Sequence, residues 1–512
     1  MTATFDLVNS PWIPCIDKEG RRGELGLLEA LVRAHELAEL RDESPLTTVA
    51  LHRLLLAVLH ASLEGPKDHK AWKALWEAGR WDPGKVERYL KKWRSRFDLF
   101  DEQYPFFQVG GFEITGKEGT PVTKLTHELA TGNIKTLFDH TVEERPTAVS
   151  PGVAARWLVA CQSYSLGGGV GATSNRFKKH PNFTHAPMVG GVAVLLQGTS
   201  LFETLTLNLV VNAEEGPVPT KGNDKPTWEQ DRIDGPSERR PRGLMEFLTW
   251  RARMVRLLPE VREGSLVVEN MHFASGWELA GRDNNPSWGY VSDPKKGLMP
   301  VGLREGRDLW RDSSALLTVI QETDGGRNKR PASLELMNQL VEREVLPPTA
   351  TLRLLTLGIA NDKAKVLFWR RDAWNVPACL VQDSAVAARL LAALSAAEVA
   401  GKATYAALSN FKEHFKEGLA EIRDRGMAAY WGALDTPFRR LVADIAAPSG
   451  RAIDAWLAAV VASSRDALED ATDNVQRRSA RELQARVDAR GLLEWKLKQV
   501  TRTGREIIDG IV

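Results

Sequence analysis

Hydrophobic positions in the last quarter of the chain recur at helical spacing. Stretches such as "SAVAARLLAALSAAEVA" and "AWLAAVVASSRDALEDA" place apolar residues at i, i+3, i+4 and i+7. Alanine and leucine are strong helix formers, and proline and glycine fall at breaks such as "APSGR". The pattern predicts four amphipathic helices, at 382–418, 424–445, 451–472 and 474–503. Short connections between long helices favour an antiparallel four-helix bundle.

The first three quarters of the chain mix helical and strand periods. The segment "TTVALHRLLLAVLHASL" (47–63) predicts a helix, in which His52 and His60 lie among leucines as packed or capping residues. The segments 190–198 and 202–211 are rich in β-branched or alternating residues and predict strands. We therefore expect an α+β fold, with a large mixed α/β domain at 1–379 and an all-α bundle at 380–512.

A β-hairpin is predicted near the end of the mixed domain. The strand-like runs 351–360 and 365–372 flank four turn residues, Asn361, Asp362, Lys363 and Ala364. We expect the tip of this hairpin to lie in solvent.

Composition limits the classes of function. The 512 residues are 43% hydrophobic, with 68 Lys and Arg against 66 Asp and Glu, a net charge of +2. Nucleic acid would therefore be bound by local basic patches rather than by the charge of the whole chain. The three cysteines are too widely spaced for C-x-x-C metal motifs, which favours a reducing cytoplasm. With no signal sequence and no apolar run of about 18 residues, we expect neither secretion nor membrane insertion.

Catalytic signatures are weak. The segment "FDHTVEE" gathers Asp139, His140, Glu143 and Glu144, the residue types of a metal or acid–base centre, but no second cluster with ligand spacing lies near it in sequence. No G-x-S-x-G elbow and no Cys/His nucleophile signature is present. We expect no catalytic site, no metal and no cofactor.

A glycine-rich segment, "YSLGGGVGATSNRFKKH" (164–180), is the most distinctive motif. It lacks the G-x-x-x-x-G-K-[ST] spacing of a phosphate-binding loop. Two interpretations remain: a turn between packed elements, or a backbone that approaches nucleic acid closely beside Arg176, Lys178 and Lys179. Three further basic loops, at 238–243, 293–297 and 325–331, favour contact with a phosphate backbone.

Several motifs resemble, in order along the whole chain, one known family. They are "FDLVNSPWIPC", "YPFFQV", "KPTWEQD", "PRGLMEFLTWRARMVRLLPE", "GLREGRDLWRD" and "LGIANDKAKVLFWRRD". The chain is similar to the CasA family, the large subunit of the type I-E CRISPR surveillance complex Cascade.

This resemblance implies a non-enzymatic role in RNA-guided immunity. The family's large subunit reads the protospacer-adjacent motif (PAM) of duplex DNA from the minor groove, helps to open the duplex for guide RNA, and recruits the helicase–nuclease. Implied partners are the other Cascade subunits, guide RNA, double-stranded target DNA and that nuclease. The alternative is a scaffold that binds only guide RNA and protein.

The resemblance also implies site residues. Gly167, Gly168 and Gly169 match the family's minor-groove glycine loop, and Asn361, Asp362 and Lys363 match a wedge hairpin that splits the duplex. The loop that contacts guide RNA or a subunit matches Leu137, Phe138, Asp139 and His140, and a lysine pair near the displaced strand matches Lys295 and Lys296. Lys363 stands where the family usually has glutamine, residues 265–280 offer no clear minor-groove lysine, and the cysteine-rich zinc element of some relatives is absent.

Overall fold

A computed structural model describes most of the 512-residue chain. The residues described are 3–116, 118–128, 147–169, 173–177, 182–211, 223–281, 284–317, 328–413, 420–447, 450–473 and 479–509. They form two compact units, each assembled from more than one stretch of sequence. The first unit is Met1–Leu303, Pro331–Leu340 and Arg353–Ala373, and the second is Arg304–Arg330, Val341–Leu352 and Trp374–Val512.

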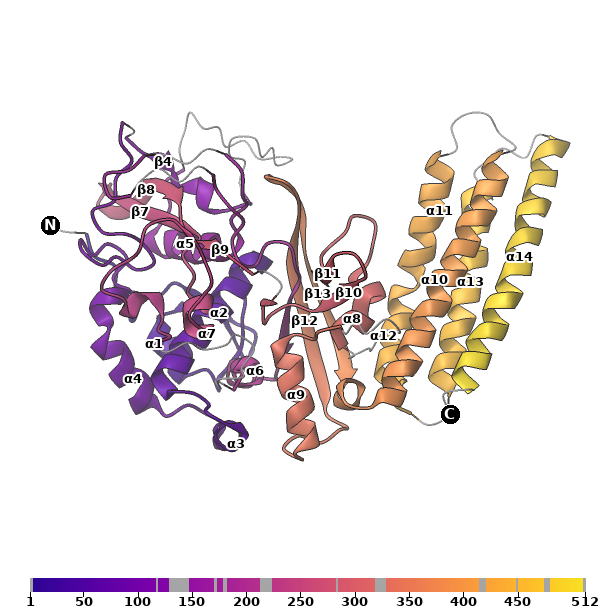
Figure 1. The fold of residues 1–512 in the computed structure, drawn as a ribbon, viewed down its shortest axis with the longest axis horizontal. Coiled ribbons are helices and arrows are strands. Elements are labelled where there is room, and N and C mark those ends of the chain that lie inside the picture. Colours follow the sequence, from indigo (N-terminus) through magenta and orange to yellow (C-terminus); the bar gives the residue numbers. More distant parts are fainter. Residues whose placement is uncertain are drawn as a thin grey trace. The chain divides into compact units, whose positions relative to one another are not determined.

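The first unit mixes helices with several small sheets, most of them antiparallel (Figure 1). Its helices are α1 (Leu27–Val32), α2 (Pro45–Leu63), α3 (His69–Ala78), α4 (Pro83–Lys92), α5 (Pro151–Tyr164), α6 (Leu201–Asn208), α7 (Leu244–Leu248) and most of α9 (Ala332–Glu342). Its strands are β1 (Ile13–Asp17), β2 (Arg22–Leu25), β3 (Leu37–Leu40), β4 (Thr120–Pro121), β5 (Ala193–Gln197), β6 (Glu238–Arg239), β7 (Arg253–Arg262), β8 (Ser265–Ser275), β9 (Glu278–Leu279), β10 (Tyr290–Asp293), β11 (Gly297–Pro300) and most of β12 (Thr351–Asp362) and β13 (Lys365–Pro377).

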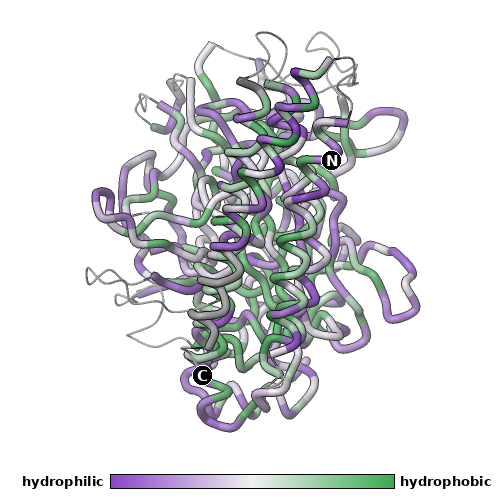
Figure 2. Tube along the Cα trace, turned by 90° about the vertical axis from the view of Figure 1, so that its right-hand side faces the viewer, coloured by the Kyte–Doolittle hydropathy of each residue, from purple (hydrophilic) through white to green (hydrophobic). Residues whose placement is uncertain are grey.

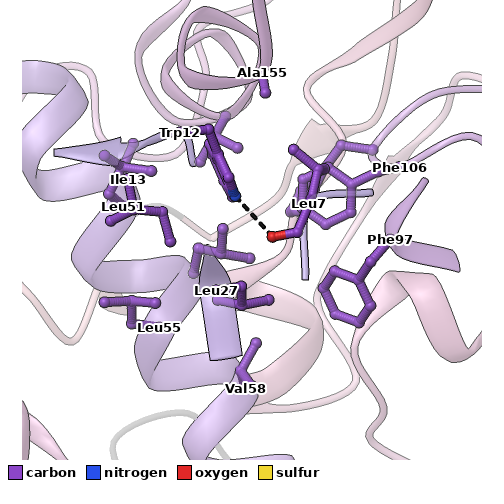
Figure 3. Close-up of a cluster of buried hydrophobic side chains, with 14 of the residues drawn as sticks. Leu7, Trp12, Ile13, Leu27, Leu51, Leu55, Val58, Phe97, Phe106 and Ala155 are labelled. Carbon is purple, nitrogen blue, oxygen red and sulfur yellow. Dashed lines mark hydrogen bonds between the residues drawn. The ribbon is translucent and has the colours of Figure 1, made fainter. Parts of the chain in front are cut away.

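Helix α2 runs through the largest hydrophobic core of this unit. Sixteen of its residues are buried, because the helix is apolar on nearly every side. Leu51, Leu55 and Val58 pack with residues from the N-terminal segment and from α5 (Figure 3). In the same cluster the indole N–H of Trp12 donates a 2.9 Å hydrogen bond to the carbonyl of Leu7 (Figure 3). The predicted helix over 47–63 is confirmed, and both of its histidines are buried.

The predicted hairpin is also confirmed. Strands β12 and β13 are neighbours in a three-stranded sheet of order β13-β12-β5. Strand β5 pairs antiparallel with β12, and Leu196 lies opposite Leu354. The sheet therefore joins the predicted strand at 190–198 to the hairpin and anchors the base of the hairpin in a buried layer.

The predicted strand at 202–211 is wrong, because its first part is helix α6. Ser200 caps the helix by accepting a hydrogen bond from the backbone N–H of Glu203, and the Glu203 carboxylate accepts one from the N–H of Thr199. The arrangement resembles a capping box, in which the carboxylate would accept from the N–H of the cap residue Ser200 itself. Here it accepts from the N–H of the preceding residue, Thr199. The hydroxyls of Thr204 and Thr206 bond the carbonyls four residues earlier. Local capping therefore outweighs the strand preference of threonine.

Long helices dominate the second unit. They are α10 (Ser384–Glu413), α11 (Ala420–Ala433), α12 (Asp435–Asp444), α13 (Arg451–Asp473) and α14 (Ala480–Asp509), preceded by the short α8 (Ser313–Leu317). Helices α10, α11, α13 and α14 lie alongside one another, and successive helices run in opposite directions (Figure 1). Hydrophilic and hydrophobic stretches alternate along the helices that face the viewer in Figure 2, as amphipathic packing requires. The second predicted helix, 424–445, is interrupted at Leu434.

The predicted boundary at 379/380 misses part of the second unit. Trp310 is fully buried, and the centre of its ring lies 5.0 Å from the centre of the Phe438 ring and 5.8 Å from that of Trp456. Arg311 donates two 2.9 Å hydrogen bonds to the carboxylate of Glu398 in α10. The segment that begins at Arg304 belongs with the helices because an aromatic contact and a charged one hold it there.

Two described helices, α2 and α10, are long and apolar enough to cross a membrane by length and composition. The apolar window of α2 is 83% buried inside the protein. Both helices serve here as packing elements of a folded unit.

Candidate nucleic-acid interface

The glycine loop leaves the C-terminal end of α5 and is held against the segment 183–186. The backbone N–H of Gly167 donates to Nδ1 of His185 at 2.8 Å. The N–H of Gly168 donates to the carbonyl of Phe183 at 2.9 Å, and Ala186 donates back to Ser165 at 2.8 Å. These bonds fix the path of the loop.

The loop needs glycine for reasons internal to the protein. Gly168 and Gly169 have φ angles of +119° and +91°, a region that other residues rarely adopt. A Cβ on Gly167 would come within 3.0 Å of the Phe183 carbonyl oxygen. Backbone conformation and packing within the protein are therefore sufficient to account for the three glycines.

The hairpin turn is tight and exposed. Lys363 and Ala364 connect β12 to β13, so Asn361 and Asp362 end a strand rather than forming part of the turn. Asn361 Nδ2 donates a 2.9 Å hydrogen bond to the carbonyl of Lys363. Lys363 has a φ of 51°, the left-handed region that a lysine enters at a cost of about 1 kcal/mol. The turn therefore holds the backbone of an exposed lysine in a conformation that a glycine would adopt more easily.

The glycine loop and the hairpin turn touch. A Cβ built on Gly168 would lie 2.8 Å from the Cβ of Ala364. The two elements are distant in sequence but belong to the same compact unit. The structure thus places the predicted glycine loop, through Gly168, against Ala364, the residue that follows the predicted Asn361–Lys363.

The predicted lysine pair lies at the tip of a second hairpin. Lys295 and Lys296 connect β10 to β11, and both residues are exposed. Their backbone N–H groups each donate 2.9 Å hydrogen bonds to the carboxylate of Asp293. These two N–H bonds, followed by the charge of Lys296, lower the pKa of Asp293. The turn is therefore ordered by its backbone, which leaves the two ammonium groups to project.

The structure describes only one of the remaining predicted residues, Arg176. Arg176 is exposed and donates from Nη1 to the carbonyl of Gly110. Lys178 and Lys179 lie outside the described residues, as does the predicted contact loop of Leu137, Phe138, Asp139 and His140. Within the described ranges, no group of three or more His, Cys, Asp or Glu side chains is placed to hold a metal ion.

Phe183 and His185 support the glycine loop, and the sequence did not identify them. They occur in "HPNFTH", whose only evident pattern is the spacing of its two histidines. The imidazole of His185 accepts a hydrogen bond at Nδ1 from the backbone N–H of Gly167. A pattern of spacing could not indicate this role, because the partner lies in a different part of the chain.

Comparisons with known proteins agree along nearly the whole chain. The sequence profile of the family described as CRISPR-associated protein Cse1 matches residues 6–467. A curated relative, CRISPR-associated protein CasA/Cse1 of Thermus thermophilus, is 34% identical over 498 residues, which cover 89% of this chain and 92% of the relative.

Solved structures show the same fold. The crystal structure of Thermus thermophilus CasA matches with a TM-score of 0.79 at 31% identity, over 97% of this chain and 100% of that one. That of Thermobifida fusca Cse1 matches with a TM-score of 0.82 at 25% identity, over 97% and 98%. A chain of a CRISPR RNA-guided surveillance complex matches with a TM-score of 0.77 at 26% identity, over 96% and 99%. The chain belongs to the Cse1 (CasA) family, the large subunits of the Cascade surveillance complex.

Proposed function

We propose that this chain is the DNA-recognition subunit of an RNA-guided surveillance complex. It reads the PAM in the minor groove of duplex DNA, starts unwinding beside the PAM, and has no catalytic activity of its own. One observation carries the proposal: the glycine loop and the tip of the β12–β13 hairpin form one surface, with Gly168 against Ala364.

The geometry suits a minor groove, which is only about 6 Å wide. At Gly168 and Gly169 the loop has no side chain that would keep base edges away from its backbone. The neighbouring hairpin is anchored through β12 to a buried sheet, so it can resist the force needed to separate a base step, which costs a few kcal/mol. Loop and hairpin would therefore act on adjacent base pairs.

Lys363 gives the hairpin tip its chemistry. A lysine ammonium is a point charge that binds phosphate, unlike the planar amide of glutamine. We propose that it holds a phosphate of one separating strand. The exposed Lys295 and Lys296 at the tip of the β10–β11 hairpin provide a second cationic contact for a displaced strand.

The sharpest test replaces Lys363 with glycine. Lys363→Gly removes the ammonium group while relieving the left-handed backbone, so the hairpin should keep its shape and stability. We expect the assembled complex to bind an intact PAM-bearing duplex about tenfold more weakly, equivalent to ~1.4 kcal/mol. Binding to a duplex already melted beside the PAM should change much less, as measured by gel shift.

Lys18→Ala is the matched control, because Lys18 is an exposed lysine on the turn between β1 and β2. It removes the same charge away from the proposed surface. Equal binding of the Lys363→Gly and wild-type complexes to the intact duplex would refute the wedge. Equal binding of wild type to PAM-bearing and PAM-mutated duplexes would favour the alternative function, a scaffold for guide RNA and protein.

Substitution of Gly168 is a poorer test than Lys363→Gly. An aspartate at that position would repel phosphates, but its Cβ would first collide with Ala364. Loss of DNA binding would then report a displaced hairpin as readily as a blocked groove.

The remaining parts of the proposal rest on family membership. We propose that the partners are the other Cascade subunits, guide RNA, double-stranded target DNA and the helicase–nuclease, and that the complex acts in the cytoplasm. Recruitment of the nuclease is testable by pull-down with the assembled complex.

A further inference from the structure

A cavity of about 670 Å³ opens in the first compact unit. No residue of the β12–β13 turn is among those that line it. Its walls come from the segments 102–111 and 227–235, with Arg96, Arg176, Phe177 and Arg251. The volume is typical of sites that bind a nucleotide-sized ligand.

Arg251 is the unusual residue of this cavity. It is only 4% exposed, and Nη1 donates a 2.7 Å hydrogen bond to the carbonyl of Gln108. Its Nε has no hydrogen-bond partner, and no carboxylate of the described residues forms an ion pair with it. Burial lowers the pKa of this guanidinium to about 9, with no neighbouring anion to offset the effect. A buried cation without an anion is costly, so an anionic ligand would relieve that cost.

The charged side chains that line the cavity, Arg251 included, carry one more positive than negative charge. Arg96 is paired with Asp231 at 2.7 Å, and its guanidinium lies 3.4 Å from the centre of the Tyr104 ring. Arg176 and the exposed Arg232 add two further cations, against the carboxylates of Glu102 and Asp234. Four arginines thus face three carboxylates.

Aromatic side chains line the same cavity. Tyr104 and Phe177 are half-buried, and the rings of Phe107 and Trp228 lie deeper. Aromatic rings beside guanidinium groups are the usual means of holding an unstacked base together with its phosphate. A peptide carboxylate would use the cations but would leave the rings without a partner.

Residues 173–177, which follow the glycine loop in sequence, lie at this cavity. This segment is fastened beside residues 113–115, where the N–H of Asn175 donates to the carbonyl of Glu113 and that of Thr115 donates to the carbonyl of Thr173, at 3.0 and 3.1 Å. Arg176 and Phe177, which follow Asn175, line the cavity. Gly168 therefore lies at the proposed duplex surface, and Arg176 and Phe177, eight and nine residues later in the sequence, lie at the cavity.

We propose that this cavity binds a nucleotide of single-stranded nucleic acid, with a phosphate at Arg251 and the base against the aromatic wall. The identity of the ligand as nucleic acid rests on the proposed function above. The site gives a strand separated at the hairpin a place to bind.

The test measures binding of a short fluorescein-labelled oligothymidylate to the full chain by fluorescence anisotropy. We expect Arg251→Gln to weaken binding about tenfold, the effect of removing a charge-assisted hydrogen bond. Arg232→Glu should weaken it at least threefold and make binding less dependent on salt, with a log–log slope shallower by about 0.7 for each phosphate no longer neutralised. Arg232 is exposed, so its variant tests the proposal even if Arg251→Gln fails to fold in a thermal melt.

Arg240→Glu is the matched control, since Arg240 is exposed on the same stretch of chain and does not line the cavity. It should bind within about twofold of wild type, as expected of a surface substitution away from the site. Wild-type affinity in both cavity variants, or equal losses in Arg232→Glu and Arg240→Glu, would overturn the site.

Two other ligands separate the alternatives. Adenosine monophosphate should bind more weakly than the oligonucleotide, and tighter binding would assign the cavity to free nucleotides. An oligoglutamate that binds as tightly as the oligonucleotide, with the same loss in Arg232→Glu, would assign it to an acidic peptide. The assay contains no duplex, so a failure of the duplex-opening proposal leaves its result intact, and the reverse also holds.

Discussion

His60 is a buried histidine near the end of α2, only 3% exposed. Its Nδ1 has no hydrogen-bond partner among the described residues. Burial lowers the pKa of the imidazole to about 4, because the charged form would be desolvated. The side chain is thus a neutral core residue, which agrees with its place among leucines in the sequence.

Stability should therefore depend on pH through His60. Because the folded-state pKa lies below the unfolded value of about 6.5, the unfolded state binds more protons between these two values. The stabilisation is fully present above pH ~6.5 and is lost as the pH falls toward 4, a total on the order of 3 kcal/mol. We expect His60→Gln to flatten the pH dependence of the melting temperature over this range. The partly exposed His35, replaced in the same way, serves as control, and unchanged curves for His60→Gln would contradict the argument.

At the scale of elements, the contact between the glycine loop and the hairpin can be measured by a double-mutant cycle. Gly168→Ala should destabilise the first unit for two reasons, a φ of +119° and the collision with Ala364. In the double variant, Ala364→Gly removes the collision and leaves the conformational cost at position 168. We expect the double variant to be more stable than the sum of the two single variants by about 0.5–3 kcal/mol, measured by urea unfolding.

Gly190 offers a matched comparison for the cycle. Its φ is +100°, but a Cβ there would meet nothing within 4 Å. Gly190→Ala should incur the conformational cost alone and show no coupling to Ala364→Gly. Equal coupling in both cycles would mean that Gly168 and Ala364 do not touch.

At the scale of the whole molecule, Trp310 joins the segment that begins at Arg304 to the helices of the second unit. Its buried ring contacts Trp431, Phe438 and Trp456. We expect Trp310→Ala to lower the stability of this unit by about 3–5 kcal/mol, the cost of a large cavity. Calorimetry should show the loss in the transition of the helical unit.

Trp495 provides the control for Trp310, because it lies on α14 with 58% of its surface exposed. Trp495→Ala should change stability by less than about 0.5 kcal/mol. The same reasoning applies to the isolated fragment 380–512, which lacks Trp310 and both arginines that bind Glu398. We expect the fragment to be helical but less cooperative in thermal melts than the unit within the whole chain, and full cooperativity would make Trp310 dispensable.

The sequence by itself determined the elements whose signal is local. Helix α2, the β12–β13 hairpin, strand β5 and the long helices of the second unit follow from periodicity, because side chains three or four residues apart share a helix face and alternate residues share a strand face. The prediction for segment 202–211 failed since two threonines favour a strand, whereas the cap at Ser200 favours a helix. Ordered motifs also determined the family, since their order along the chain is itself sequence information.

Only the tertiary structure decided which distant residues meet. The contact between Gly168 and Ala364, the support from Phe183 and His185, and the place of Trp310 among the helices each join parts of the chain that carry no shared local pattern. Arg251 appears in the sequence as one of many arginines, and only the structure places it at the cavity, buried and without an ion pair among the described residues. Packing and desolvation depend on neighbours in space, and the fold supplies those neighbours.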